Sequence, residues 1–331
     1  MVHVLVLGGT GWLGGEVARQ ARESGAQVTC AARGSTGTAP SGVRFVAMDR
    51  SVPDSFAALP AGEWDAVIDV SSQPRYVLEA VQALGQRTAH WTYVSSASVY
   101  VRADRPGDDE SASVHPPLVG DFDAMEDYGA TKAACERHVL AALGDRALIA
   151  RAGLIAGPGD PSDRFGYWPA AFARAESDEV LVPDEPALST QAIDVRDLAQ
   201  WIVEAPAAGT HGVLDAVGEP TALPDVLTAA ARAASFRGHH VPASPQWLTE
   251  QGVQPWAGPR SLPLWLPLPE YAGFGARSGR SARDAGLTCR PLPDTLADAL
   301  VHERTRGLDR PRRAGLTRAE ERALLAEVPR G

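Results

Sequence analysis

Short runs of apolar residues alternate with helix-like segments over the first half of the chain. The first run, residues 2–7, is continuous rather than alternating, as expected for a central parallel strand that is buried on both faces. The same reasoning predicts further strands at 27–32, 43–48, 66–70, 91–95 and 147–151, and helices at 12–24, 52–59, 75–84 and 128–143. Strand, helix and strand repeated in this way predict an α/β fold with a doubly wound parallel sheet.

The second half of the chain is less regular and contains more proline. Helical spacing recurs at 196–204, 224–234 and 295–304, while residues 256–275 combine proline, glycine and aromatic residues as a structured loop does. The charged tail, residues 310–331, is expected to add a peripheral helix. We therefore predict two domains, a sheet domain over residues 1–160 and a smaller C-terminal α/β domain over residues 161–331.

Composition narrows the class of protein. The 331 residues carry a formal net charge of -10 and contain no long basic run, which argues against nucleic acid or an anionic membrane as a partner. No apolar run approaches about 18 residues, so no transmembrane helix is expected. The 3 cysteines stand far apart, without a spacing suited to a metal, and fit a reducing compartment. We expect a cytoplasmic protein without a metal site.

A glycine-rich turn joins the first predicted strand to the first predicted helix. Glycines at such a junction permit a tight turn and let a pyrophosphate approach the N–H groups of a helix N-terminus. The strand-to-helix position is the context in which the motif indicates a dinucleotide. We therefore expect a Rossmann-type site in the first domain, with the second domain binding the substrate. The residues of the expected dinucleotide site are Gly8, Gly9, Thr10, Gly11, Trp12, Leu13 and Gly14.

The end of the second predicted strand indicates which dinucleotide binds. Proteins that bind NAD place an acidic residue there to hold the ribose 2′-hydroxyl. This chain has Arg33 and no carboxylate, and a guanidinium fork suits a 2′-phosphate; an ordinary surface arginine is the alternative. We expect NADP rather than NAD. Asp49 is a candidate for the adenine ring or a solvated loop residue, and Arg50 and Ser71 are further cofactor candidates.

One lysine stands alone in a chain that otherwise uses arginine. Lys132 is the only lysine among the 31 lysine and arginine residues, and it follows Tyr128 by four positions. Residues with this spacing share one face of a helix. A lysine ammonium is a compact charge whose donors reach several oxygens, and beside a phenol it favours the phenolate form. The pair is therefore a candidate for acid/base chemistry.

Several segments together resemble the extended short-chain dehydrogenase/reductase family, also called the NAD-dependent epimerase/dehydratase family. The resemblance is strong over residues 1–160 and weaker through 193–199, where the family's usual histidine is missing, and through 281–292. It is carried by the glycine turn, Val94-Ser95-Ser96-Ala97-Ser98-Val99-Tyr100, Tyr128-x-x-x-Lys132 and Arg151-Ala-Gly-Leu-Ile-Ala-Gly157-Pro158-Gly159.

The resemblance implies a role for each candidate catalytic residue. Tyr128 would protonate a carbonyl oxygen during reduction or deprotonate an alcohol during oxidation. Lys132 would favour the phenolate and hold the nicotinamide ribose. Ser96 aligns with the Ser/Thr that hydrogen-bonds the substrate oxygen, whereas Ser95 and Ser98 are expected to have capping or turn roles. The family also implies a homodimer, formed through 75–84 and 128–143.

Two departures from the family pattern narrow the chemistry. Sugar-nucleotide 4,6-dehydratases carry an Asp-Glu pair directly after the Ser/Thr, where this chain has Ala97-Ser98. A dehydratase of that type is therefore not expected. Members that bind nucleotide sugars usually have Asn three residues after the arginine that matches Arg151, where this chain has Leu154.

The second half carries a weaker signal for the substrate. Its aromatic residues either line a pocket or pack a small domain: Phe165, Tyr167, Trp168, Trp247, Trp256, Trp265, Tyr271 and Phe274. Arg164 and Arg260 either meet an anionic substrate or are surface charges. We expect an NADPH-dependent oxidoreductase that acts on a carbonyl or alcohol of a small, partly apolar molecule. The alternatives are a nucleotide-sugar epimerase or reductase and a non-catalytic NADP-binding regulatory protein.

Overall fold

A seven-stranded parallel sheet forms the centre of the first half of the molecule. The computed structural model describes residues 2–175 and 178–329. The sheet has the order β11-β6-β5-β4-β1-β2-β3, and every neighbouring pair is parallel. This confirms the predicted doubly wound Rossmann sheet. Its strands are β1 (His3–Leu7), β2 (Gln27–Ala32), β3 (Arg44–Ala47), β4 (Trp64–Asp69), β5 (Thr88–Ser96), β6 (Ala147–Ala152) and β11 (Gly212–Ala216).

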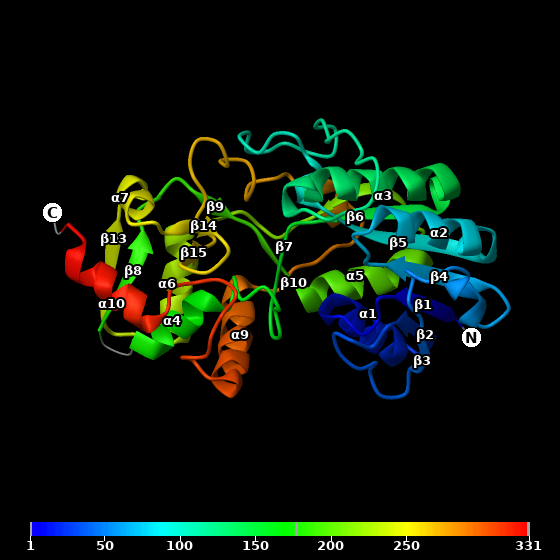
Figure 1. The fold of residues 1–331 in the computed structure, drawn as a ribbon, viewed down its shortest axis with the longest axis horizontal. Helices are drawn as coiled ribbons and strands as arrows, with labels where there is room; N and C mark the ends of the chain where they lie inside the picture. The colour runs from blue at the N-terminus through cyan, green and yellow to red at the C-terminus, as the bar shows by residue number, and fades with distance from the viewer. Residues whose placement is uncertain (1, 176–177, 330–331) are drawn as a thin grey trace.

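Helices cover both faces of the sheet (Figure 1), and this explains the continuous apolar run of β1. Val4 and Val6 pack into a core with α1 (Trp12–Glu23) and α5 (Val195–Ala208). Leu5 and Leu7, which point to the opposite face, pack under α2 (Pro74–Leu84) and α3 (Tyr128–Leu143). A strand buried on both sides has no polar positions to alternate.

Two sequence expectations differ from the structure in this half. The segment 52–59 forms only a short 3-10 helix, η1 (Ser55–Ala58), none of whose residues is buried, while Leu59 after it packs into the core. The edge strand β11 was not predicted, and it pairs with β6. Both α5 and β11 lie beyond residue 160, so the predicted division of the chain does not coincide with the limit of the sheet.

The other half of the molecule lies beside the carboxyl ends of the strands (Figure 1). It has its own core, which contains the fully buried Phe165, Tyr167, Trp168 and Trp265. Its helices are α4 (Tyr167–Ala175), α6 (Leu223–Ala233), α7 (Pro245–Glu250), α9 (Leu292–Arg306) and α10 (Arg318–Glu327). Its strands are β8 (Glu179–Pro183), β13 (His239–Ala243), β14 (Gln254–Trp256) and β15 (Ser261–Pro263).

Short elements connect the two halves and complete the tail. Parallel β7 (Leu154–Ala156) and β10 (Ala192–Asp194), antiparallel β9 (Ser189–Thr190) and β12 (Thr221–Ala222), and α8 (Arg280–Asp284) lie along the connection. The predicted helix of the charged tail is confirmed as α10. It begins with a capping box between Thr317 and Glu320, and a buried ion pair of 2.7 Å between Arg174 and Glu321 attaches it to α4.

Residues 2–175 and 178–329 contain neither a membrane-spanning helix nor a cluster of metal-binding side chains. No helix there is long and apolar enough to cross a bilayer. The same residues contain no group of three or more His, Cys, Asp or Glu side chains placed to hold a metal ion.

Candidate active site

The turn between β1 and α1 has the shape of a dinucleotide cradle. A Cβ at Gly9 would lie 2.3 Å from the Sγ of Cys30, and a Cβ at Gly14 would lie 2.3 Å from the carbonyl oxygen of Gly8. Glycine is therefore required at both positions. Helix α1 begins after Gly11 without a side-chain cap, which leaves its first N–H groups free for a pyrophosphate. The residues present fit a dinucleotide.

The loop after β2 lies against this cradle. A Cβ at Gly37 would come within 2.4 Å of the Thr10 carbonyl oxygen, so the loop passes directly over the glycine turn. Arg33 opens this loop with an exposed side chain. Asp49 accepts hydrogen bonds from the N–H (2.9 Å) and hydroxyl (2.8 Å) of Ser51, which together with the charge of Arg33 lower the pKa of the Asp49 carboxyl.

Two other cofactor candidates have internal partners. The guanidinium of Arg50 forms a two-pronged pair with the fully buried Asp69, at 2.9 and 3.0 Å. The same carboxylate accepts the N–H of Ser71 at 2.9 Å. Arg50 therefore stabilises the end of β4, and its contact with a cofactor stays a prediction. The carbonyl oxygen of Ser71 accepts the hydroxyl of Tyr93 at 2.9 Å.

Lys132 lies in α3 with its ammonium directed under the ends of β4 and β5. It is 3% exposed and donates to the Ser71 carbonyl (3.0 Å), the Tyr93 hydroxyl (2.9 Å) and the Val94 carbonyl (2.7 Å). These bonds use all three N–H donors. Contact with a nicotinamide ribose, as the family resemblance implies, would require at least one of them to be exchanged.

A short 3-10 helix, η3 (Ala97–Val99), carries two serines at the end of β5. Ser96 caps it by accepting the N–H of Ser98 at 3.1 Å, and its hydroxyl donates to the Ser98 hydroxyl at 3.1 Å. The capping role that was expected of Ser95 and Ser98 thus falls to Ser96. Ser98 instead lines a cavity that also contains Tyr128. Ser95 donates to the buried Glu136 and is used within the core.

The first turn of α3 fits closely against η3. A Cβ at Gly129 would lie 2.3 Å from the Ser98 carbonyl oxygen, so the glycine that follows Tyr128 permits this approach. The rings of Tyr128 and Phe122 lie 6.0 Å apart. The side chain of Gln73 holds Phe122 by accepting its N–H at 2.8 Å and donating to its carbonyl at 3.2 Å. Tyr128 is therefore positioned from two sides.

A buried polar network lies beneath these groups. Arg151 pairs with Glu136 at 2.8 Å and donates to the Tyr100 hydroxyl at 2.9 Å. Tyr100 in turn donates to Asp215 at 2.6 Å, and Asp215 pairs with Arg277 at 2.7 Å. Burial raises the pKa of Tyr100 well above its usual value, and the neighbouring Asp215 carboxylate adds to this effect. The network joins α3, β6 and β11 to the segment that follows η3, at the carboxyl end of the sheet.

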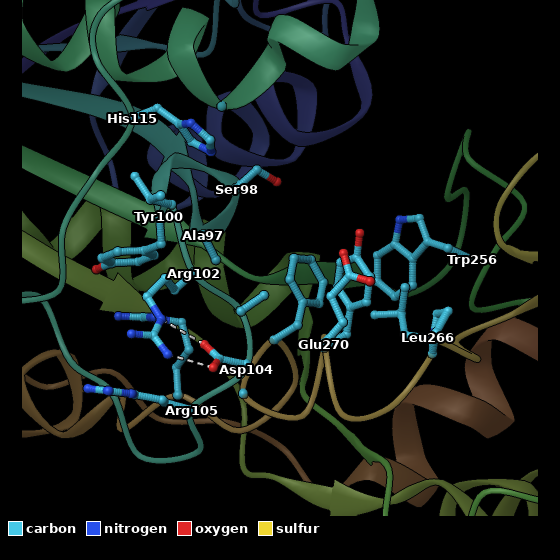
Figure 2. Close-up of a pocket in the computed structure, with 18 of the residues that line it drawn as sticks. Ala97, Ser98, Tyr100, Arg102, Asp104, Arg105, His115, Trp256, Leu266 and Glu270 are labelled. Atoms are coloured by element: carbon cyan, nitrogen blue, oxygen red, sulfur yellow. Dashed lines mark hydrogen bonds and ion pairs between the residues drawn. The ribbon is translucent and has the colours of Figure 1, made fainter.

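Tyr128 and Ser98 line one cavity of about 1090 Å³ between the two halves. Figure 2 shows Ser98, Tyr100 and His115 on one side of it and Trp256 on the other. Trp256, Tyr271 and Phe274 give it an aromatic wall, and Arg102 pairs with Asp104 (2.7 Å) at its edge. The aromatic residues of loop 256–275 therefore have both of the roles considered from the sequence. Trp265 packs in the core, whereas the other three rings line the cavity.

Sequence reasoning missed several residues of the site. Gln73 and Phe122 bind each other across 49 residues of sequence. Arg277 binds Asp215, 62 residues away, and the Asp109 carbonyl, 168 residues away. No local pattern in the sequence marks these three residues. Ser98 carried a usable signal, because it lies two positions after Ser96 in a segment that turns at the carboxyl edge of the sheet.

Comparison with known proteins gives the site its context. The sequence model of the NAD dependent epimerase/dehydratase family matches residues 4–214. The 2′-dehydrokanamycin reductase of Streptomyces kanamyceticus is 32% identical over 192 residues, which are 55% of this chain and 52% of that protein. The chain thus spans about half the length of this curated relative.

Solved structures show the same fold at low sequence identity. UDP-glucose 4-epimerase of Thermus thermophilus, in complex with NAD, superposes with a TM-score of 0.65 at 18% identity, covering 92% of this chain and 99% of that one. RMD of Pseudomonas aeruginosa, complexed with NADPH, gives 0.63 at 20% identity over 93% and 100%. Because the family match extends over most of the chain, the protein belongs to the NAD-dependent epimerase/dehydratase family.

Proposed function

We propose that this enzyme is an NADPH-dependent oxidoreductase that reduces a carbonyl, or oxidises the corresponding alcohol, of a small, partly apolar molecule. The observation that carries the proposal is the cavity in which Tyr128 and Ser98 lie opposite Trp256, Tyr271 and Phe274. A proton donor and a hydroxyl at one wall, with aromatic rings at the other, suit a ligand that has a reactive oxygen and an apolar body.

Each catalytic candidate has a task at the reacting oxygen. When bound, the cofactor supplies a hydride from C4 of the nicotinamide. Tyr128 donates its phenolic proton to the carbonyl oxygen, and the Ser96–Ser98 pair donates a hydrogen bond to the same oxygen. The buried ammonium of Lys132 favours the phenolate that remains, and a donor released from the Ser71 carbonyl would hold the nicotinamide ribose.

The preference for NADP rests on the loop that begins at Arg33. The guanidinium is exposed, and the loop is held over the glycine turn by the close approach of Gly37 to Thr10. The nearby Asp49 accepts two hydrogen bonds from Ser51 and makes none with Arg33 among the described residues. A 2′-phosphate at this position would receive charge-assisted hydrogen bonds.

Two observations favour reduction of a non-nucleotide substrate. The curated relative is named for the reduction of 2′-dehydrokanamycin. Leu154, which stands where nucleotide-sugar members usually have Asn, is 5% exposed and packs into the core of the second half. It offers no polar group to a nucleotide sugar.

Oxidation of NADPH, followed by absorbance against two substrate panels, tests the proposal. One panel holds aldehydes and ketones without a nucleotide, and the other holds nucleotide-linked keto sugars. We expect turnover with the first panel. Turnover confined to the second panel would contradict the proposal and favour a nucleotide-sugar reductase. Epimerisation of a nucleotide sugar without net NADPH consumption would also contradict the proposal and would favour an epimerase.

A further inference from the structure

Arg164 carries a positive charge that forms no ion pair within the part of the chain that the structure describes. Its side chain is half-buried, in the loop that follows β7. Within residues 2–175 and 178–329, no Asp or Glu oxygen lies within ion-pair distance of its guanidinium, whereas Arg151 and Arg277 of the buried network both have carboxylate partners. Burial lowers the pKa of Arg164. A desolvated charge of this kind is unfavourable unless a ligand completes it.

The two nearest acidic residues in the sequence make their hydrogen bonds and ion pairs with other groups, and Asp160 acts on Arg164 only through its charge. Asp160 accepts the N–H and the hydroxyl of Ser162, both at 2.8 Å. Asp163 binds Arg306 (3.3 Å), the N–H of Arg313 (2.9 Å) and Arg310. The loop therefore uses both carboxylates to hold its own shape and to attach it to the second half.

Ser162 and Trp256 fix the direction of the guanidinium. The Nε of Arg164 donates to the Ser162 hydroxyl at 3.1 Å, and the guanidinium carbon lies 4.7 Å from the centre of the Trp256 ring. Trp256 has a φ of 65°, a left-handed conformation that is unfavourable for an aromatic residue and is concentrated at functional sites. With Nε used, the two terminal nitrogens of Arg164 are left to bind a ligand.

The orientation of Arg164 connects it to the catalytic cavity. Trp256 also lines the cavity that contains Tyr128. Negative charges on Asp160 and, to a smaller extent, on the Tyr128 phenol would raise the pKa of Arg164, so the guanidinium lies near both groups. Trp256, which touches both, thus links the guanidinium to the cavity where the substrate would react.

We propose that the terminal nitrogens of Arg164 bind an oxyanion of the substrate, a carboxylate or phosphoryl group, close to the carbonyl that Tyr128 protonates. This inference rests on the proposed function and adds a substrate class to it. A planar guanidinium binds such an anion with two parallel hydrogen bonds, and stacking on an indole keeps the plane fixed. The same chemistry could serve a phosphate of the cofactor, and the experiment separates the two sources.

The test compares two pairs of probes in wild type and Arg164→Gln. The first pair, 4-formylbenzoate and benzaldehyde, differs in one carboxylate and is followed by NADPH oxidation. We expect kcat/KM for 4-formylbenzoate to fall about tenfold or more in Arg164→Gln, with little change for benzaldehyde, because a hydrogen bond to a charged group is lost. An equal fall for both aldehydes would overturn the inference.

The second pair, benzoate and benzamide, measures binding by calorimetry and does not depend on turnover. We expect wild type to bind benzoate more tightly and Arg164→Gln to lose that difference. If neither aldehyde is reduced, the proposed function fails for this class while the calorimetry still decides the role of Arg164. No preference for benzoate in the wild type would overturn the inference.

A matched control and a cofactor titration complete the test. The control variant Arg260→Gln removes an arginine from the same half of the molecule. Arg260 contacts Glu320 (3.7 Å) and the Gln251 carbonyl. Its loss should leave benzoate binding unchanged. Binding of NADPH should be the same in wild type and Arg164→Gln. A loss of NADPH affinity with intact benzoate binding would assign Arg164 to the cofactor and contradict the proposal.

Discussion

Ser96 donates a hydrogen bond to Ser98 across 3.1 Å at the point where β5 ends. In return, the Ser96 hydroxyl accepts the backbone N–H of Ser98. The two serines therefore form a unit in which Ser96 directs the Ser98 hydroxyl into the cavity that also contains Tyr128. The hydrogen of the Ser98 hydroxyl is left free by this arrangement, so in the proposed mechanism Ser96 would act on the substrate oxygen through Ser98 or share its contact.

This relationship predicts that the two serines are not independent in catalysis. Ser96→Ala and Ser98→Ala should each lower kcat by about tenfold or more, and the double variant should lose little beyond the larger single effect. Binding of NADPH should be unchanged in all three. Losses in kcat that multiply in the double variant would show that the hydroxyls act separately, and an unaffected Ser98→Ala would remove Ser98 from the site.

The cofactor preference is tested at the loop after β2. Arg33→Ala should weaken NADPH binding by about tenfold to a hundredfold and leave NADH binding within about twofold, because only NADPH presents a 2′-phosphate. Calorimetric titration with both cofactors measures this. Arg44→Ala, which removes an exposed arginine from the neighbouring strand β3, is the control. An equal loss for both cofactors in Arg33→Ala would refute the assignment.

The buried pair of Arg151 and Glu136 is expected to support the stability of the catalytic end of the sheet. Their side chains are 7% and 5% exposed, so Arg151→Met would leave the Glu136 carboxylate buried without its cation. We expect the free energy of unfolding in urea to fall by about 3–5 kcal/mol. The control is Arg102→Met, whose pair with Asp104 is 53% and 40% exposed and should contribute at most about 1 kcal/mol. Similar losses for the two variants would contradict this account.

His90 predicts a dependence of stability on pH. Its ring is 8% exposed, its Nε2 contacts the Thr210 carbonyl at 2.8 Å, and its Nδ1 is buried without a partner. Burial lowers the pKa of His90 in the folded protein. The unfolded chain therefore takes up the proton first, and the contribution of the neutral ring is present above about pH 6.5 and is lost as the pH falls below it.

The measurement compares wild type with His90→Gln, whose amide can still donate to the Thr210 carbonyl and does not titrate. The stability advantage of the wild type should shrink between about pH 7 and about pH 5. Other titrating groups cancel in this difference. Unfolding curves that keep a constant separation over this range would show that His90 titrates alike in the folded and unfolded chain.

The sequence predicted the parts of the fold that depend on local pattern. The limits of β2 agree with the prediction because its residues are buried and bounded by glycine-containing loops. The strand β11 escaped notice because Gly212–Ala216 is short, contains Asp215 and lies at the edge of the sheet. The segment 52–59 has helical spacing, but only Phe56 and Leu59 pack against the core, and periodicity alone cannot reveal how little of a segment is buried.

The candidate site shows the same limit more sharply. The glycine turn and the Tyr128–Lys132 spacing are local, so the sequence alone could indicate them. The bonds of the Lys132 ammonium depend on Ser71, Tyr93 and Val94, which the fold brings to it from other strands. Likewise, Arg164 forms no ion pair with the neighbouring Asp163 because Asp163 pairs with Arg306 and Arg310 near the C-terminus. Such pairings are set by tertiary structure.

The central claim, that Tyr128 transfers the proton in an NADPH-dependent reduction, is tested most directly by Tyr128→Phe. The variant keeps the ring that packs near Phe122 and removes only the hydroxyl. Turnover of a carbonyl substrate accepted by the wild type should fall by about a hundredfold or more, with the affinity for NADPH unchanged. Turnover at the wild-type rate, with NADPH bound normally, would contradict the account.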